Sequence, residues 1–288
     1  MKDSEKTIDI WLEETFKINR NKIAIVEDMN RITYGDMEKK INQYGCYFKR
    51  RGISMGELVV LRIPNVKEFV FALLGLIKIG SIPIVTNPLF GENELNGIFD
   101  KTDASTLVFY DDDELSLKIR QGSTSRQICK ITVKDIGKDL KEDTENIIEE
   151  KKELDSIAIL MLSSGTTGVP KLIPITHRMI YWHIYGYNQK FQFTSDDNYL
   201  ACLPIAHKMG LYSPGILNVF FAGGKAVLCN NLDCDDIFAQ IEKENITITA
   251  LVPTLARIWD QYLSQGCRYD LSSIRKIIIG GSFVDESL

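Results

Sequence analysis

Residues 163–171, SSGTTGVPK, combine residue types that bind phosphate. Gly165 and Gly168 let the backbone curl and present its N–H groups. Lys171 adds a positive charge, and four hydroxyl side chains can reach phosphate oxygens: Ser163, Ser164, Thr166 and Thr167. The segment follows the apolar run AILML and precedes an expected helix. The sequence therefore predicts a strand–loop–helix that holds phosphate groups.

Two other interpretations of this segment are weaker. A Walker A loop does not fit, because Gly165 and Gly168 are too close together and Pro170 precedes the lysine. This also disfavours a GTPase-like switch. A flexible Ser/Gly surface turn fits the composition, but the order of the residues argues against it.

His207 is the second candidate for chemistry. It lies in LPIAHK, between an expected strand end and an apolar helix. A lone histidine is more often a hydrogen-bonded structural residue than a catalytic one, so its motif context has to decide. His177 and His183 lie on the expected helix after the loop, without such a context, and are interpreted as structural.

Apolar strand-like runs alternate with segments of helical spacing along the whole chain. The expected strands are residues 57–63, 82–86, 106–110, 157–162, 198–203, 225–228, 247–252 and 274–279. The expected helices are residues 37–50, 65–79, 92–101, 177–190, 211–221, 235–244 and 254–263. This alternation predicts an α/β fold of layered, parallel-rich sheets with helices on both faces.

The charged residues 134–153 are the clearest composition shift and predict a solvated helix or connector. They suggest a first α/β subdomain over residues 1–150 and a second over residues 151–288, although the two halves could share one extended sheet system. The second subdomain would carry the phosphate-binding loop.

Composition narrows the class of protein. Of the 288 residues, 44% are hydrophobic and 25% charged, which is typical of a soluble globular protein. A net charge of −5 does not suggest nucleic acid as a partner. The six cysteines include no C-x-x-C pair, which leaves zinc ribbons unsupported and favours reduced thiols. No targeting or membrane-spanning segment is recognisable, so we expect a cytoplasmic protein without a membrane partner.

The SSGTTGVPK segment resembles the phosphate-binding signature of the adenylate-forming (ANL) superfamily, which comprises acyl- and aryl-CoA ligases, adenylation domains of nonribosomal peptide synthetases, and luciferases. Further similar motifs follow the family order: residues 32–42, 65–88, 203–215, 248–259 and 277–284. LPIAHKMGLYSPG and ITALVPTLARIW look most like the aryl-acid branch, which includes 2,3-dihydroxybenzoate-AMP ligases. The resemblance covers nearly the whole chain and implies the large N-terminal ANL domain.

The resemblance implies a two-step ligase that uses ATP and Mg²⁺. A small carboxylic acid, expected to be an aryl acid, becomes an acyl-adenylate. The acyl group then passes to a thiol of CoA or of a phosphopantetheinyl carrier protein, as in nonribosomal peptide or siderophore biosynthesis.

By the same resemblance, residues 163–171 hold the β- and γ-phosphates, and Lys171 and His207 are the catalytic candidates. The expected nucleotide-binding residues are Ser163, Ser164, Gly165, Thr166, Thr167, Gly168, Lys171, Gly280 and Gly281, the last two lying against the adenine. The expected acyl-substrate residues are His207, Lys208, Gly210, Tyr212 and Ser213.

Two departures qualify this expectation. Family members continue well beyond the position of Leu288, so the rest of the N-terminal domain and the small C-terminal domain are expected to be absent. The acidic Mg²⁺ ligand, the ribose aspartate and a catalytic lysine would be absent with them, so no metal ligand is assigned. This chain alone is then expected to be poorly active or inactive, and the alternative is a truncated nucleotide- or partner-binding module without turnover.

Lys208 is the second departure, because aryl-acid enzymes commonly carry an amide residue there. We expect the Lys208 ammonium to face the acyl pocket and to favour an acid with an extra acidic or phenolic substituent. The alternative is a lysine whose stem covers apolar surface while its ammonium stays in solvent.

Overall fold

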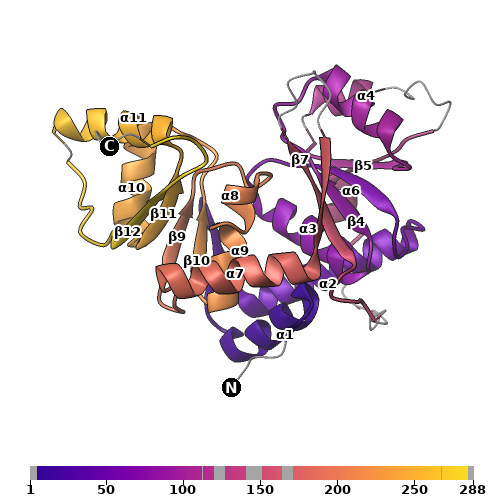
Figure 1. The fold of residues 1–288 in the computed structure, drawn as a ribbon, viewed down its shortest axis with the longest axis horizontal. Coiled ribbons are helices and arrows are strands. Elements are labelled where there is room, and N and C mark those ends of the chain that lie inside the picture. The colour runs from indigo at the N-terminus through magenta and orange to yellow at the C-terminus, as the bar shows by residue number, and fades with distance from the viewer. Residues whose placement is uncertain are drawn as a thin grey trace. The chain divides into compact units, whose positions relative to one another are not determined.

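The computed structural model describes residues 5–111, 113–119, 127–140, 151–163, 171–266 and 268–284. The chain forms two compact units, each built on one mixed sheet (Figure 1). The first unit comprises Met1–Glu13, Asp36–Pro64 and Glu68–Tyr181. The second comprises Glu14–Gly35, Asn65–Lys67 and Trp182–Leu288. The units therefore interleave along the sequence.

The sheet of the first unit has the strand order β6-β5-β3-β4-β7-β8. Its strands are β3 (Leu58–Arg62), β4 (Ile82–Val85), β5 (Thr106–Phe109), β6 (Cys129–Thr132), β7 (Ile157–Ser163) and β8 (Lys171–Thr176). All neighbours are parallel except β7 and β8. The strands are nearly all apolar because both faces of a parallel sheet are covered by helices.

The main helices of the first unit are α2 (Tyr34–Arg50), α3 (Lys67–Lys78) and α4 (Glu92–Lys101). Two short helices follow them in the chain: α5 (Glu114–Lys118) and α6 (Val133–Lys138). Helices α2 and α3 pack together through Tyr44 and Phe71, whose ring centroids are 5.7 Å apart. Helix α4 covers the sheet through a core cluster that joins Leu95 and Phe99 to Val60 and Leu107. The buried apolar face of α4 thus fixes it on the sheet.

The sheet of the second unit has the strand order β12-β11-β9-β10-β1-β2. Its strands are β1 (Ile23–Glu27), β2 (Asn30–Thr33), β9 (Asn198–Ala201), β10 (Lys225–Leu228), β11 (Ile248–Leu251) and β12 (Lys276–Ile279). Only β2 runs antiparallel to its neighbour. The helices in this part of the chain are α8 (Lys208–Leu211), α9 (Ile216–Ala222), α10 (Cys234–Glu244) and α11 (Pro253–Ser264).

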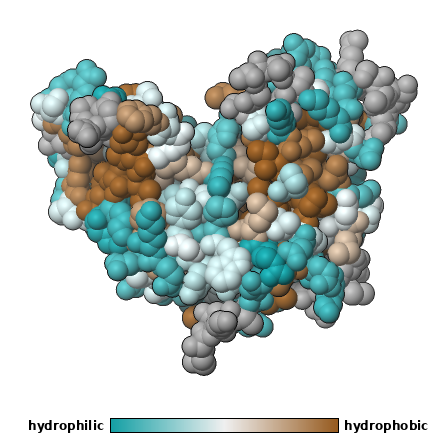
Figure 2. Space-filling view, viewed as in Figure 1, coloured by the Kyte–Doolittle hydropathy of each residue, from teal (hydrophilic) through white to brown (hydrophobic). Residues whose placement is uncertain are grey.

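The helices α1 (Ile8–Asn19) and α7 (His177–Phe191) are each divided between the two units. Strand β12 is the edge of its sheet among the described residues. Exposed apolar side chains occur on α11 and on and after β12: Ile258, Ile277, Phe283 and Val284. Figure 2 shows brown, apolar surface on the face of the second unit that is turned to the viewer.

The expected fold class, an α/β protein with parallel-rich sheets and helices on both faces, is confirmed. The units differ from the expected halves, because β7, beyond residue 150, pairs with β4 through Leu160 and Ile84. The helix expected over residues 211–221 begins only at Ile216, as α9; α8 ends at Leu211, and the break at residues 212–215 contains Pro214. Proline cannot occupy a helix interior without losing a hydrogen bond and clashing with the preceding turn.

Within the described ranges, no helix combines the length and the apolar character needed to cross a membrane.

Candidate functional site

Strands β7 and β8 hold the two ends of the predicted phosphate-binding segment. They run antiparallel, with Ser163 opposite Lys171 at the end of the ladder. The segment therefore connects two strands, and the expected strand–loop–helix is wrong: helix α7 begins only at His177, after β8. The β-branched residues of KLIPIT explain the extra strand. Ser164, Gly165, Thr166, Thr167 and Gly168 lie outside the described residues.

The other predicted site residues follow three neighbouring strands of the second unit. The order β12-β11-β9 is parallel throughout. The segment 202–207 follows β9, Val252 follows β11, and Gly280 follows β12. Carboxyl ends of parallel strands meet at one edge of a sheet, which is where open α/β sheets bind ligands. The topology thus brings these three segments together.

Asn65 fixes the segment that leads to His207. Its amide nitrogen donates to the carbonyl of Leu203 at 2.8 Å, and its amide oxygen accepts from the backbone N–H of Ile205 at 2.9 Å. The same nitrogen also approaches the carbonyls of Ala201 and Cys229, at 3.4 Å each. One side chain therefore ties the end of β9 to the segment after it.

Helix α8 begins directly after His207 and packs very closely on the preceding loop. A Cβ atom at Gly210 would lie 2.3 Å from the carbonyl oxygen of Pro204. That distance is far below van der Waals contact, so only glycine permits this approach. Gly210 itself is buried, and its observed role is to let α8 lie against the backbone of residues 204–205.

Met209 links α8 to the glycines that follow β12. Its methyl carbon lies 3.5 Å from the position of a Cβ on Gly280, and its sulfur 3.6 Å from that of a Cβ on Gly281. Gly281 has φ +83°, a left-handed conformation that favours glycine. The backbone N–H of Gly280 donates to the carbonyl of Leu251 at 3.1 Å. The expected adenine-site glycines and the expected acyl-site helix are thus brought together.

His183 of α7 lies beside the predicted acyl residues. Its Nδ1 is 3.2 Å from the Oγ of Ser213, a hydrogen bond whose direction depends on the imidazole tautomer. Its ring stands edge-on to Tyr212, with centroids 5.6 Å apart, and stacks on Tyr187 at 6.3 Å. Tyr212 is 1% exposed and Ser213 7% exposed, whereas His183 is half-buried, so this contact is partly buried.

The electrostatics of the site favour neutral imidazoles. Partial desolvation lowers the pKa of His207 below its usual value, although its surface is largely exposed. Burial also lowers the pKa of His183, and the positive charge of Lys208 adds to this effect. Burial raises the pKa of Tyr212 to about 12. At neutral pH these groups act as hydrogen-bonding groups, and Lys208 carries the positive charge.

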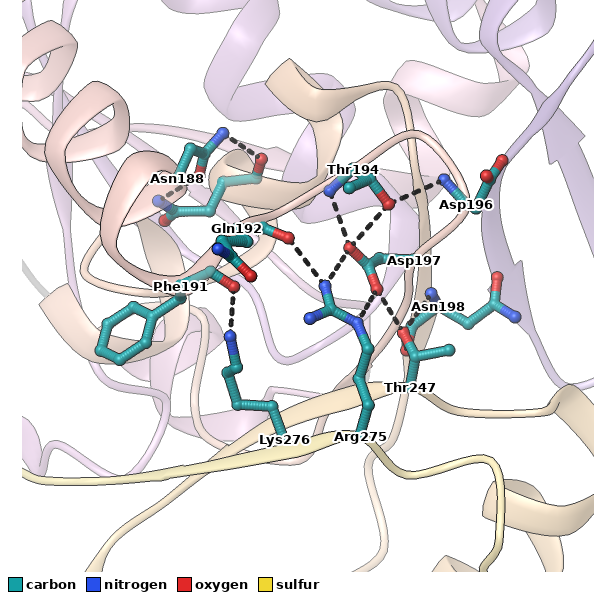
Figure 3. Close-up of polar contacts among 11 residues, drawn as sticks. Asn188, Phe191, Gln192, Thr194, Asp196, Asp197, Asn198, Thr247, Arg275 and Lys276 are labelled. Atoms are coloured by element: carbon teal, nitrogen blue, oxygen red, sulfur yellow. Dashed lines mark hydrogen bonds and ion pairs between the residues drawn. The ribbon is translucent and has the colours of Figure 1, made fainter.

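A buried carboxylate organises the opposite ends of the same strands. Figure 3 shows Asp197 accepting two hydrogen bonds from Arg275 and one from the hydroxyl of Thr247. Arg275 also donates to the carbonyl of Gln192, while Lys276 donates to that of Phe191 at the end of α7. Burial by itself raises the pKa of Asp197, but the hydrogen bonds from Arg275 and Thr247 lower it overall. The network thereby fixes α7 against β9, β11 and β12.

The structure thus groups the predicted residues in two sets. Ser163 and Lys171 face each other in the first unit, and the remaining described candidates gather in the second: His207, Lys208, Gly210, Tyr212, Ser213, Gly280 and Gly281. Sequence reasoning missed Asn65 and His183. An asparagine at the start of an expected helix signals only a cap, and His183 falls within an aromatic helix face. Neither pattern reveals the long-range partner.

The described residues offer no group of side chains suited to bind Mg²⁺. They contain no group of three or more His, Cys, Asp or Glu side chains that could hold a metal ion. No described residue is therefore assigned to Mg²⁺.

Comparisons with known proteins agree along the whole chain. The family described as "AMP-binding enzyme" matches residues 12–288. Enterobactin synthase component E of Escherichia coli (strain K12) is 30% identical over 92% of this chain and 52% of its own length. The 2,3-dihydroxybenzoate-AMP ligase of Bacillus subtilis (strain 168) is 32% identical over 94% of this chain and 53% of its own length.

A solved structure shows the same fold. The apo structure of Mycobacterium smegmatis MbtA superposes with a TM-score of 0.86 and 27% identity, covering 97% of this chain and 53% of that chain. The chain spans about half the length of the curated relatives it matches.

Proposed function

The chain belongs to the AMP-binding enzyme family, and from this premise we propose that its protein uses ATP to activate an aryl carboxylic acid as an acyl-adenylate. The acyl group then passes to a thiol, of CoA or of a phosphopantetheinyl carrier protein. One observation carries the proposal: the segments after β9, β11 and β12 converge, so that Met209 of α8, two residues after His207, lies beside Gly280 and Gly281. Two relatives named as 2,3-dihydroxybenzoate-AMP ligases support the aryl acid as substrate class.

The proposed first step joins a carboxylate oxygen to the α-phosphorus of ATP. The bond from the α-phosphorus to the bridging oxygen breaks, and pyrophosphate leaves with that oxygen. In the second step a thiolate attacks the acyl carbon, and AMP leaves with the carboxylate oxygen. Both reactants of the first step are anionic, so charge repulsion is the main obstacle, and positioned donors and cations lower it.

The phosphate contacts are proposed for the ends of β7 and β8 and for the segment between them. Lys171 supplies a cation and Ser163 a hydroxyl, and the two residues lie opposite each other on β8 and β7. Together with the other hydroxyls of residues 163–171 they would hold the β- and γ-phosphates. This assignment rests on residue chemistry and on the family membership of the chain.

The acyl and adenine contacts are proposed for the second unit. His207, at the N-terminus of α8, would lie beside the acid and the α-phosphate, where a neutral imidazole adds no charge of its own. Lys208, Tyr212 and Ser213 would line the acyl site, and Gly280 and Gly281 would lie against the adenine. Gly210 contributes by allowing α8 to approach the preceding loop.

The test is ATP–pyrophosphate exchange with the full product of the gene and, separately, with the 288-residue chain. The acids are benzoate, 2-hydroxybenzoate and 2,3-dihydroxybenzoate, with alanine as the comparison. We expect exchange that depends on an aryl acid with the full product, and much slower exchange with the chain alone. Nucleotide binding without acid-dependent exchange in either protein would contradict the proposal and favour a binding module without turnover.

A further inference from the structure

Neighbouring side chains hold the imidazole of His183, on α7, in contact with Ser213. Asn188, one turn beyond His183, is fixed by two hydrogen bonds with Asn218 of α9, at 3.0 Å each. The ring of His183 is held between Tyr187 on its own helix and Tyr212 at the end of α8. These contacts leave the imidazole little freedom to rotate. The 3.2 Å contact to Ser213 is therefore a fixed feature of this helix pair.

The Ser213 hydroxyl retains unused hydrogen-bonding capacity in either tautomer of His183. A serine hydroxyl has one donor and two acceptor sites, and a neutral imidazole has one N–H and one lone pair. If Nδ1 carries the proton, it donates to Ser213 and the hydroxyl proton of Ser213 is available to a ligand. If Nδ1 is unprotonated, Ser213 donates to it and a ligand can donate to the Ser213 oxygen. A phenolic hydroxyl matches both states, because it can donate and accept.

Resting on the proposed function, we infer that His183 is a positioning residue that determines specificity: it orients the hydroxyl of Ser213 so that the acyl site selects a hydroxylated aryl acid over the bare one. An acid with only C–H at that position leaves the remaining hydrogen-bonding capacity of the buried Ser213 hydroxyl unused, which costs binding free energy. We expect a preference of about tenfold, the size of one hydrogen bond to a neutral group.

Lys208 assists the same selection by its charge. Burial lowers the pKa of His183 and the charge of Lys208 adds to this effect, which keeps the imidazole neutral and able to use either tautomer. A cation in range of the pair also favours an electron-rich phenolic oxygen over an aromatic C–H. Among the described residues, Lys208 is the charged group that acts on the His183 ring. The rings beside His183 are the phenols of Tyr187 and Tyr212.

The experiment separates hydrogen bonding from packing with two substitutions. His183→Asn keeps an amide near the position of Nδ1 but removes the ring, whereas His183→Phe keeps a ring and removes the hydrogen bond. Gln189→Ala, an exposed position on the same helix, is the control. Dissociation constants of benzoate, 2-hydroxybenzoate and 3-hydroxybenzoate for the 288-residue chain are measured by ligand-observed NMR, after circular dichroism has shown that each variant is folded.

We expect the unmodified chain, Gln189→Ala and His183→Asn to bind at least one hydroxybenzoate about tenfold more tightly than benzoate. In His183→Phe the preference should fall below twofold, with benzoate affinity changed less than threefold. Adding Ser213→Ala to His183→Phe should cause no further loss.

Preference retained in His183→Phe, or lost in His183→Asn alone, would overturn the inference and assign His183 to packing. Equal binding of all three acids by the unmodified chain would also overturn it and would leave the proposed function standing. Binding of none of the acids would contradict the aryl-acid assignment itself.

Discussion

Replacing Asn65 by leucine tests whether this side chain holds the segment before His207. Leucine has a similar size and branching, so the change removes hydrogen bonds rather than volume. The substitution removes the two short hydrogen bonds, at 2.8 and 2.9 Å. The contacts at 3.4 Å are long and contribute little to the free energy of unfolding. Ile205 is fully buried and Leu203 is 7% exposed, so neither backbone group regains water easily.

Each buried polar group left without a partner costs about 1–3 kcal/mol, so the two groups together give a destabilisation of about 2–6 kcal/mol for Asn65→Leu. Two compact units need not unfold in one step, so an unfolding curve alone does not report on the segment after β9. We therefore combine guanidinium unfolding with hydrogen exchange at one amide of that segment. We therefore expect a lower midpoint in guanidinium and faster hydrogen exchange at the amide of Ile205.

Asn65→Asp refines the test. Aspartate still accepts from Ile205 but, when ionised, cannot donate to Leu203 and repels that carbonyl. This raises the pKa of the new carboxyl in the folded state above its unfolded value. The destabilisation is then present above the folded pKa and is relieved as pH falls through it, because the protonated acid can donate. Unfolding free energy of Asn65→Leu within about 0.5 kcal/mol of the unmodified chain, with unchanged exchange at Ile205, would refute the reasoning.

Three further predictions concern single side chains. Lys171→Ala should weaken ATP binding or pyrophosphate exchange by about 10- to 100-fold, the worth of a charge-assisted contact of about 1.5–3 kcal/mol, and unchanged values would refute the phosphate assignment. Lys208→Asn should alter the ranking of benzoate derivatives in the exchange assay; an identical ranking would show that Lys208 does not face the acid. Burial lowers the pKa of His177 to about 4, so its NMR titration midpoint should lie near pH 4. The unfolded chain binds that proton near pH 6.5, so stability should fall as pH drops from about 6.5 to 4, and a midpoint near 6.5 would contradict this.

Local patterns predicted the regular elements well. Residues 92–101 and 225–228 are a helix and a strand with the expected bounds, because each has the periodicity or composition of its element and a clear end. Strand β8 was missed because Pro174 argues against a strand. The structure accommodates it, since β8 is an edge strand with Pro174 opposite Leu160.

Positions that depend on distant partners could not be predicted. Asn65 lies 140 residues before Ile205, and no spacing rule connects the two. His183 meets Ser213 only because α7 packs beside the turn between α8 and α9. The motif containing His207, by contrast, is contiguous, and its place after a parallel strand follows from the strand pattern alone. The residues of the site were therefore more predictable than the side chains that position them.

The central claim, that the acid is activated at the α-phosphorus of ATP, is tested most directly by isotope transfer. An aryl acid labelled with ¹⁸O in its carboxylate is incubated with ATP, a thiol acceptor and the full product of the gene, and the phosphorus products are analysed by mass spectrometry. Attack on the α-phosphorus followed by thiol transfer leaves one carboxylate oxygen on AMP, so the account predicts ¹⁸O in AMP and none in inorganic phosphate. Label in inorganic phosphate, with ADP as the nucleotide product, would show that the acid attacks the γ-phosphorus and would contradict the account.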